Sequence, residues 1–255
     1  MDFGKTIAVW GRNGSGKTTI TAGLANLLAA KDALVCVISA NTEFSTIQHL
    51  LDMEIPLEKS IKTAIKFKGN DLIDKFVIHP KNKNLYVLAV SEYDDCMNDE
   101  KVSEEDAKNL YMTVRERFDY ILVDCTQNFR DALTFLGIFN ADTIIEVVKA
   151  TLPDYMFRTS YKAFFEEFRF ADKAITILNQ EDNFVDIKKM EKHLGIQFSY
   201  IFPYTKTVRK SESNCELLTA KNIVTTKDKA YVKELDKLTA SLLINAESGE
   251  RSVAE

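Results

Sequence analysis

The chain has 255 residues, of which 45% are hydrophobic and 28% are charged, and its formal net charge is −5. This length suffices for one α/β domain with its own core, and this composition excludes an intrinsically disordered chain. The acidic balance argues against a protein that coats nucleic acid. Because no apolar run reaches the roughly 20 residues of a membrane span and no apolar leader precedes the first strand, we expect a cytoplasmic protein.

Apolar strand-like runs alternate with helical patterns along the chain. In the first half we predict, in chain order, a strand at 6–10, a helix at 18–30, a strand at 33–39, a helix at 56–67, a strand at 85–90, a helix that begins at Glu104 behind a Ser103 cap, and a strand at 119–124. In the second half we predict a helix near 129–139, a strand at 143–148, a helix from Pro153 to about residue 170, a strand at 174–178, a helix at 185–194, a strand at 198–202 and a closing helix at 228–244.

Continuously apolar strands that are separated by helices indicate an α/β fold. We expect a mostly parallel sheet of about seven strands with helices on both faces. One domain over residues 1–244 is the simplest organisation, and residues 245–255 form a polar tail that we expect to be flexible.

A phosphate-binding pattern, G-x-x-x-x-G-K-T, runs from Gly11 to Thr18 between the first strand and the first helix. Glycines let such a loop curl so that its N–H groups face phosphate oxygens, and the following helix directs its positive end at the same anion. Lys17 would bind the β- and γ-phosphates. The alternative is a glycine-rich turn without a ligand. We assign nucleotide binding to Gly11, Asn13, Gly14, Ser15, Gly16, Lys17, Thr18 and Thr19.

A metal site is predicted from Thr18 and Asp124. The Thr18 hydroxyl is the Mg²⁺ ligand of the phosphate loop, and Asp124 ends an apolar strand. Its carboxylate would emerge at the carboxyl edge of the sheet, where open α/β folds bind ligands. The alternative is that Asp124 only begins a turn.

Several stretches together resemble the MinD/ParA group of P-loop ATPases, and within it the CpaE/TadZ-like branch. The specific stretch is AVWGRNGSGKTT at 8–19, followed by AGLANLL at 22–28 and the strand at 119–124, with weaker matches at 141–145, 175–179 and 201–204. The resemblance covers residues 5–240 and implies a SIMIBI-like P-loop NTPase fold with ATP and Mg²⁺ as cofactors. It also implies that Asn179 and Pro203 lie near the adenine base.

Two positions depart from the family pattern. Arg12 replaces a signature lysine that crosses to the phosphates of the partner subunit; it either substitutes for that lysine or is a solvated surface residue. Asn41 stands where the family usually has an acid that orients the attacking water. An amide is not a base, so we expect slow hydrolysis unless Glu43 or a partner supplies the missing group. The candidate catalytic residues are Lys17, Arg12 and Asn41.

The resemblance implies an ATP-dependent homodimer that binds a protein partner. It would position or regulate a pilus, secretion, conjugation or DNA partition assembly while hydrolysing ATP slowly. Two alternatives remain open: a nucleotide-bound scaffold with negligible turnover, and a metabolic enzyme on the same fold. DNA contact through the lysines after Pro203 is less favoured because acids are interspersed among them. The closing helix is followed by acids, so we expect it to pack on the domain rather than on a membrane.

Overall fold

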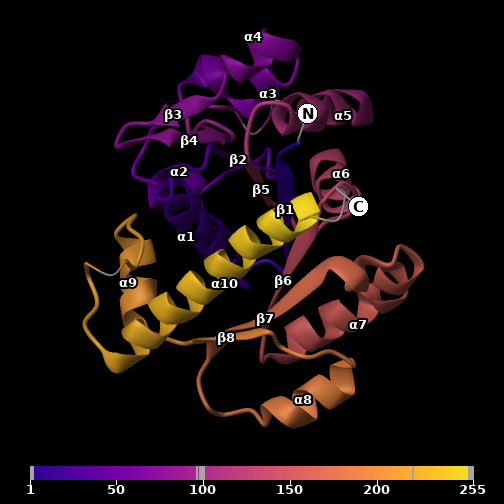
Figure 1. Ribbon diagram of the computed structural model, residues 1–255, viewed down its shortest axis with the longest axis vertical. Coiled ribbons are helices and arrows are strands. Elements are labelled where there is room, and N and C mark those ends of the chain that lie inside the picture. Colours follow the sequence, from indigo (N-terminus) through magenta and orange to yellow (C-terminus); the bar gives the residue numbers. More distant parts are fainter. Residues whose placement is uncertain (1–2, 96, 98–100, 220, 252–255) are drawn as a thin grey trace.

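The sheet at the centre of the molecule has eight strands in the order β3-β4-β2-β5-β1-β6-β7-β8, with helices on both faces (Figure 1). The computed structural model describes residues 3–95, 97, 101–219 and 221–251. Among the strands of the described residues, only β3 and β4 pair antiparallel, and the other neighbouring strands are parallel. The predicted α/β fold with a mostly parallel sheet is therefore confirmed, with eight strands instead of about seven.

The strands are β1 (Lys5–Trp10), β2 (Val35–Ser39), β3 (Val77–His79), β4 (Asn82–Leu88), β5 (Tyr120–Asp124), β6 (Thr143–Lys149), β7 (Ala174–Glu181) and β8 (Tyr200–Pro203). The helices are α1 (Lys17–Ala29), α2 (Ile47–Leu50), α3 (Ile61–Ala64), α4 (Gly69–Ile73), α5 (Glu104–Arg115), α6 (Ala132–Phe139), α7 (Leu152–Glu167), α8 (Ile187–Leu194), α9 (Lys206–Ser213) and α10 (Thr226–Arg251), with short 3₁₀ turns η1 (Leu57–Lys59) and η2 (Phe170–Lys173). Because β1 lies between β5 and β6, the loop that follows it emerges near the middle of the carboxyl edge of the sheet.

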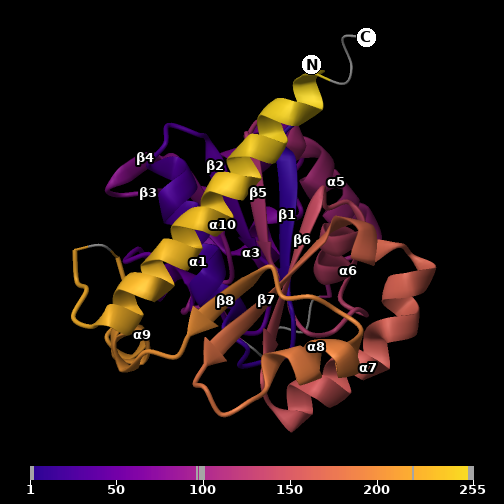
Figure 2. The ribbon, with the colours of Figure 1, turned by 60° about the horizontal axis from the view of Figure 1, so that its bottom comes forward.

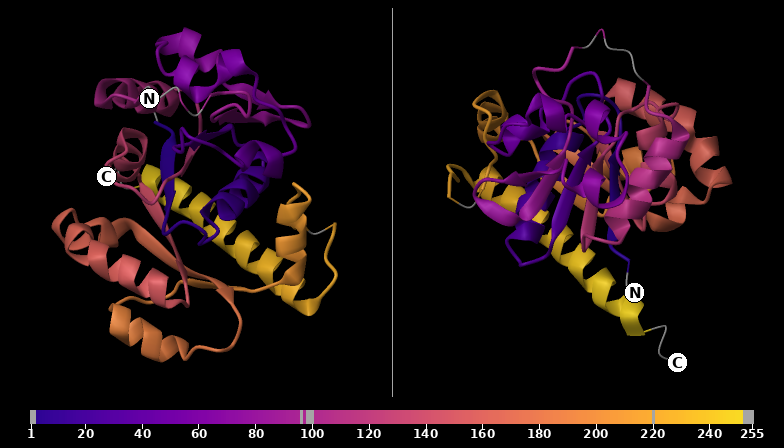
Figure 3. Two further views of the ribbon diagram at one scale, coloured as in Figure 1. Left: turned by 180° about the vertical axis from the view of Figure 1, so that it is seen from behind. Right: turned by 90° about the horizontal axis from the view of Figure 1, so that it is seen from above.

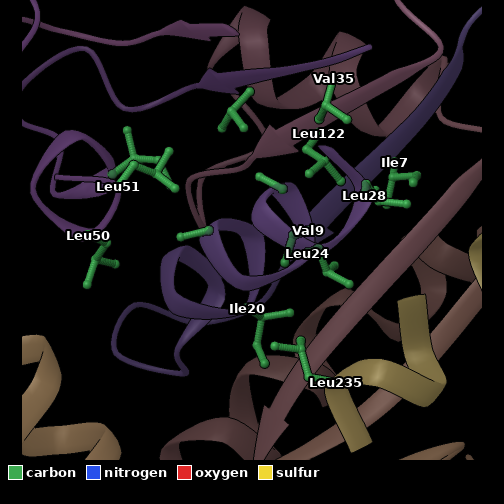
Figure 4. Packing of buried hydrophobic residues seen from close by; sticks show 14 of the residues in the cluster. Ile7, Val9, Ile20, Leu24, Leu28, Val35, Leu50, Leu51, Leu122 and Leu235 are labelled. Atoms are coloured by element: carbon green, nitrogen blue, oxygen red, sulfur yellow. The ribbon is translucent and has the colours of Figure 1, made fainter. Parts of the chain in front are cut away.

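Alternation along β1 explains why both faces of the sheet are covered. Ile7 and Val9 point to one face, where they belong to a core formed with α1 and α10. Figure 4 shows them beside Leu24 and Leu28 of α1, with Leu235 of α10 nearby. The side chains of Ala8 and Trp10 point to the other face and join the core under α5, α6 and α7. Successive residues of a strand face opposite sides of the sheet, so a strand that is apolar throughout needs helices on both faces of the sheet.

The long helix α10 lies across β8 and α1, and Figure 2 and the right-hand view of Figure 3 show its C-terminal part extending beyond the body of the molecule. It begins at Thr226 and runs to Arg251, past the predicted end at residue 244 and into the predicted tail. The tail residues 252–255 lie outside the described residues. Within the described part of the chain, no helix combines the length and the apolar character that crossing a bilayer requires.

Three local features differ from the predictions. The predicted helix at 56–67 is broken into η1 and α3, because Ser60 between them has an extended backbone and its hydroxyl bonds to Asp94. The predicted strand at 85–90 is β4, which begins at Asn82 and forms a hairpin with the unpredicted β3. Helices α2, α4 and α9 were also unpredicted. The Ser103 cap was correct: its hydroxyl accepts the Asp106 N–H at 3.1 Å.

Candidate functional site

The loop between β1 and α1 adopts, at its glycines, backbone angles that other residues reach only with strain. Gly14 has φ +79° and Gly16 has φ +98°, both in the left-handed region. A Cβ on Gly16 would lie 2.3 Å from Nδ2 of Asn179. Any other residue at Gly16 would therefore displace either the loop or the side chain of Asn179, in addition to the strain of its positive φ.

Lys17 is buried at the start of α1, and its ammonium group turns back into the loop. Its Nζ donates to the backbone carbonyl of Arg12 at 3.1 Å, and the residue is only 7% exposed. Burial lowers the pKa of Lys17, and the carboxylate of Asp124 counteracts part of this effect. A desolvated cation enclosed by a loop of this shape is suited to binding an anion.

Thr18 and Asp124 meet as the metal-site prediction requires. The Thr18 hydroxyl donates to Oδ2 of Asp124 at 2.8 Å, while the buried Oδ1 has no hydrogen-bond partner. Buried carboxylate oxygens normally have partners, so this free oxygen points to a missing one. A hydroxyl beside a carboxylate is an oxygen donor set that fits Mg²⁺. Among the described residues, no group of three or more His, Cys, Asp or Glu side chains could hold a metal, so the phosphates of a nucleotide would complete this site.

Burial of Asp124 raises its pKa to about 6, although Lys17 and Thr18 oppose the shift. The folded state thus binds the Asp124 proton more tightly than the unfolded state does. The resulting loss of stability is absent below about pH 4 and complete above about pH 6. We expect Asp124→Asn to raise the free energy of unfolding of the nucleotide-free, metal-free protein by about 1–3 kcal/mol at pH 8. Urea denaturation with EDTA at pH 8 and pH 5 measures this, and the gain must be smaller at pH 5; a variant that is less stable at pH 8 would contradict the prediction.

Arg12 lies in an ion pair within its own chain, and both readings of its role, a substitute for the signature lysine or a solvated surface residue, stay predictions. Its Nε donates to Oδ2 of Asp154 at 3.1 Å. Asp154 stands in the first turn of α7, is 2% exposed, and also accepts the hydroxyl of the N-cap residue Thr151. The side chain of Arg12 as a whole is 30% exposed.

Asn41 follows β2 and closes a turn. Its Oδ1 accepts the N–H of Glu43 at 3.0 Å and that of Phe44 at 3.4 Å. Asn41, Glu43 and Phe44 all line an open groove in front of the phosphate loop. The structure therefore places Asn41 at the site with its carbonyl oxygen engaged by the backbone, and its catalytic role stays a prediction.

The side chain of Asn179 forms a hydrogen bond with the phosphate loop. Its Nδ2 donates to the carbonyl of Ser15 at 2.7 Å, and its Oδ1 accepts the Gln180 N–H at 2.9 Å. Asn179, Pro203 and Thr19 line one small cavity of about 20 Å³, which has room for about one water molecule and not for a purine base. The Thr19 hydroxyl donates to Oε1 of Glu212 at 2.5 Å, so α9 closes this cavity. The contact of Asn179 and Pro203 with an adenine base stays a prediction.

Sequence reasoning missed two polar side chains of the groove. Gln127 follows β5, and its Oε1 accepts the Asn13 N–H at 3.0 Å. Lys149 ends β6, and its Nζ donates to the carbonyl of Gly14 at 3.4 Å. Both stand at the carboxyl ends of the strands that flank β1. Ligands of open α/β folds bind at the carboxyl ends of the strands, and this rule would have marked both residues as candidates.

The groove is larger than a nucleotide needs. It has a volume of about 1600 Å³, against roughly 300–1000 Å³ for a typical small-molecule site. Its walls come from the phosphate loop, the segment after β2 and the loop after β5. A nucleotide at the loop would leave open space in front of it.

Comparisons with known proteins agree with this geometry. The AAA_31 family model, described as "AAA domain", matches residues 4–156. The septum site-determining protein MinD of Thermotoga maritima is 28% identical over 172 residues, which span 66% of this chain and 60% of that relative. A ParA family ATPase of Chlorobium tepidum has the same fold, with a TM-score of 0.75, 16% identity, and coverage of 91% of this chain and 98% of that one.

A third similar protein is the MinD of Pyrococcus horikoshii, solved in complex with Mg-ADP, with a TM-score of 0.70, 16% identity, and coverage of 92% of this chain and 96% of that one. At such identities the structural likeness shows the fold, while the family match rests on the phosphate-loop half of the sequence. The CpaE/TadZ-like branch stays a prediction. The chain belongs to the MinD/ParA superfamily of P-loop ATPases.

Proposed function

We propose that this chain binds Mg-ATP at the loop from Gly11 to Thr18 and that two copies associate around the bound nucleotide. The dimer positions or regulates a larger cellular assembly, and slow ATP hydrolysis or nucleotide release returns it to monomers. The observation that carries this proposal is the grouping of Lys17, Thr18 and the unpartnered oxygen of Asp124 around one loop. The Mg-ADP complex of the Pyrococcus horikoshii relative supports the choice of ligand.

Each residue has a distinct role in this proposal. The backbone N–H groups of the loop and the Lys17 ammonium bind the phosphates, and Asn179 holds the loop in shape through Ser15. Thr18 and Asp124 hold Mg²⁺, which neutralises phosphate charge when bound. Burial disfavours the ionised form of Asp124, so a bound cation would stabilise this carboxylate.

The first turns of α7 support association on this side of the molecule. Leu152 is 73% exposed and Met156 is 58% exposed, and both lie on the helix segment that carries Asp154. Exposed apolar side chains that gather next to a ligand site are typical of a surface that meets a partner. Arg12 bonds to Asp154 in the same helix segment, and its guanidinium can bind phosphate oxygens in pairs.

We expect light scattering after size-exclusion chromatography to show the molar mass of a dimer with saturating Mg-ATP and of a monomer with Mg-ADP. Arg12→Ala should stay monomeric with Mg-ATP, because it removes the cation that reaches the partner. Arg117→Ala is the matched control: Arg117 is an exposed arginine whose guanidinium bonds to the side chain of Asn70. A wild-type chain that stays monomeric with ATP, or an Arg12→Ala chain that dimerises normally, would overturn the proposed association.

A second candidate is a nucleotide-bound scaffold with negligible turnover. It is favoured by Asn41, an amide in place of an acid, whose oxygen is engaged by two backbone N–H groups. Phosphate release separates the two candidates: tight ATP binding without measurable release selects the scaffold.

A further inference from the structure

Gln127 is held in place from two directions in the loop between β5 and α6. Its side-chain oxygen accepts the N–H of Asn13, inside the phosphate loop, at 3.0 Å. Its backbone carbonyl accepts the hydroxyl of Tyr161, which comes from α7, at 3.4 Å. The Tyr161 ring packs edge-on against the buried Trp10 with centroids 5.1 Å apart. The position of Gln127 is therefore fixed by the core as well as by the phosphate loop.

The contact with Asn13 also settles which way the amide points. A backbone N–H can only donate, so the atom it meets is the oxygen of Gln127 and not the nitrogen. The amide nitrogen keeps its two hydrogens, and the oxygen keeps a second lone pair. A half-buried carboxamide with these groups free, in a groove in front of the phosphate loop, can both accept from and donate to a water molecule.

The other two candidates in the groove are less suited to this task. Asn41 has its oxygen engaged by two backbone N–H groups. Glu43 is exposed, and its negative charge would face the negative charge of a terminal phosphate. Gln127 is neutral, so it adds no repulsion.

We infer that Gln127 orients the attacking water in ATP hydrolysis, an inference that rests on the proposed binding of ATP. In that step the water oxygen forms a bond to the γ-phosphorus, and the bond from the γ-phosphorus to the oxygen shared with the β-phosphate breaks. The electron pair of that bond leaves with ADP, and the protons of the water pass to inorganic phosphate and solvent. Gln127 gains and loses no proton; it positions the water, a role that glutamines have in other nucleotide hydrolases.

The test compares three variants of the full chain: Gln127→Ala, Gln127→Glu and the control Gln197→Ala. Gln127→Ala should lower kcat by at least about 10-fold, while the Kd for ATP changes by less than about twofold. Gln197→Ala, at an exposed glutamine that does not line the groove, should keep kcat within about threefold of the wild type. Gln127→Glu, which keeps the shape and the acceptor for Asn13, should also lose turnover while its melting temperature stays near that of the wild type.

A binding readout separates positioning of the water from a structural effect. Gln127→Ala should bind ADP as the wild type does but lose the tighter binding of ADP with aluminium fluoride, which mimics the transferring phosphoryl group with its water. Wild-type kcat in Gln127→Ala, an equal loss in kcat and in ATP affinity, or no turnover in a wild type that binds ATP would each overturn the inference. Failure of the ATP-binding proposal gives a different result, because the wild type would then not bind ATP at all.

Discussion

Lys17→Ala should reduce the affinity for Mg-ATP by at least about 100-fold, which is about 2.7 kcal/mol of binding free energy. Lys17 is buried with its ammonium group directed at the inside of the phosphate loop, and Asp124 is its principal stabilising charge. Alanine removes the side-chain cation that the motif aims at the β- and γ-phosphates. Isothermal titration calorimetry with ATP measures the effect directly.

A matched control lies at the other end of the same helix. Lys31 is exposed just beyond α1, and Lys31→Ala should bind ATP with wild-type affinity. Both variants should be checked for folding by circular dichroism, because Lys17 also bonds the carbonyl of Arg12. Unchanged ATP affinity in a folded Lys17→Ala chain would refute the assignment of the loop.

Arg158→Met should lower the free energy of unfolding by about 3–5 kcal/mol, because it leaves a buried carboxylate without its partner. Glu146 lies on β6 and is 1% exposed; its Oε1 is 2.5 Å from Nε of Arg158, and its Oε2 accepts the Thr176 hydroxyl at 3.2 Å. The N–H of Nε does not point at the carboxylate, so the contact is a close ion pair and not an aligned hydrogen bond. Urea denaturation measures the loss.

The pH dependence of this loss has a defined sign. Burial raises the pKa of Glu146 and Arg158 opposes the rise, so removing Arg158 raises it further. The folded variant then holds the proton of Glu146 more tightly than the unfolded chain. Its stability must fall as pH rises from the ordinary glutamate pKa of about 4.3 towards the raised folded value. The loss at pH 8 should therefore exceed the loss at pH 5.

Two further variants test whether the effect of Arg158→Met comes from the buried ion pair with Glu146. The double variant Arg158→Met/Glu146→Leu should recover most of the lost stability, since apolar replacements of a buried pair are often neutral or stabilising. Lys162→Met removes an exposed cation of the same helix that pairs with Glu166 and should change stability by less than about 1 kcal/mol. A single variant as stable as the wild type would show that the pair contributes nothing to the fold.

The features that could be predicted from the sequence are those that depend on residues close together in the chain. The phosphate loop, the strand ending at Asp124 and the Ser103 cap each depend on residues within a few positions of one another. Strand β3 was missed because three residues are too few to show a period of two, and α9 because its eight residues are mostly polar. Such short elements are held by tertiary contacts more than by local preference.

Pairings across long stretches of chain could not be predicted. Arg12 meets Asp154 across 142 positions, and Asn13 meets Gln127 across 114. Asp154 stands in no pattern that distinguishes it from an ordinary helix-start acid, and the place of Gln127 after a predicted strand does not name Asn13 as its partner. Only the order of the strands, which brings the ends of β1, β5 and β6 together, makes these residues neighbours of the phosphate loop.

The ion pair between Arg12 and Asp154 has a consequence for how association would depend on protein abundance. If Arg12 turns outward to a second copy, a carboxylate that is 2% exposed keeps only the Thr151 hydroxyl of its two side-chain partners. The interactions formed across the proposed dimer interface must first offset that loss, which would raise the dissociation constant and with it the threshold concentration at which dimers predominate. Arg12→Lys, which pairs less rigidly, should shift this threshold, and the amount of protein in the cell would then act as a second input beside the supply of ATP.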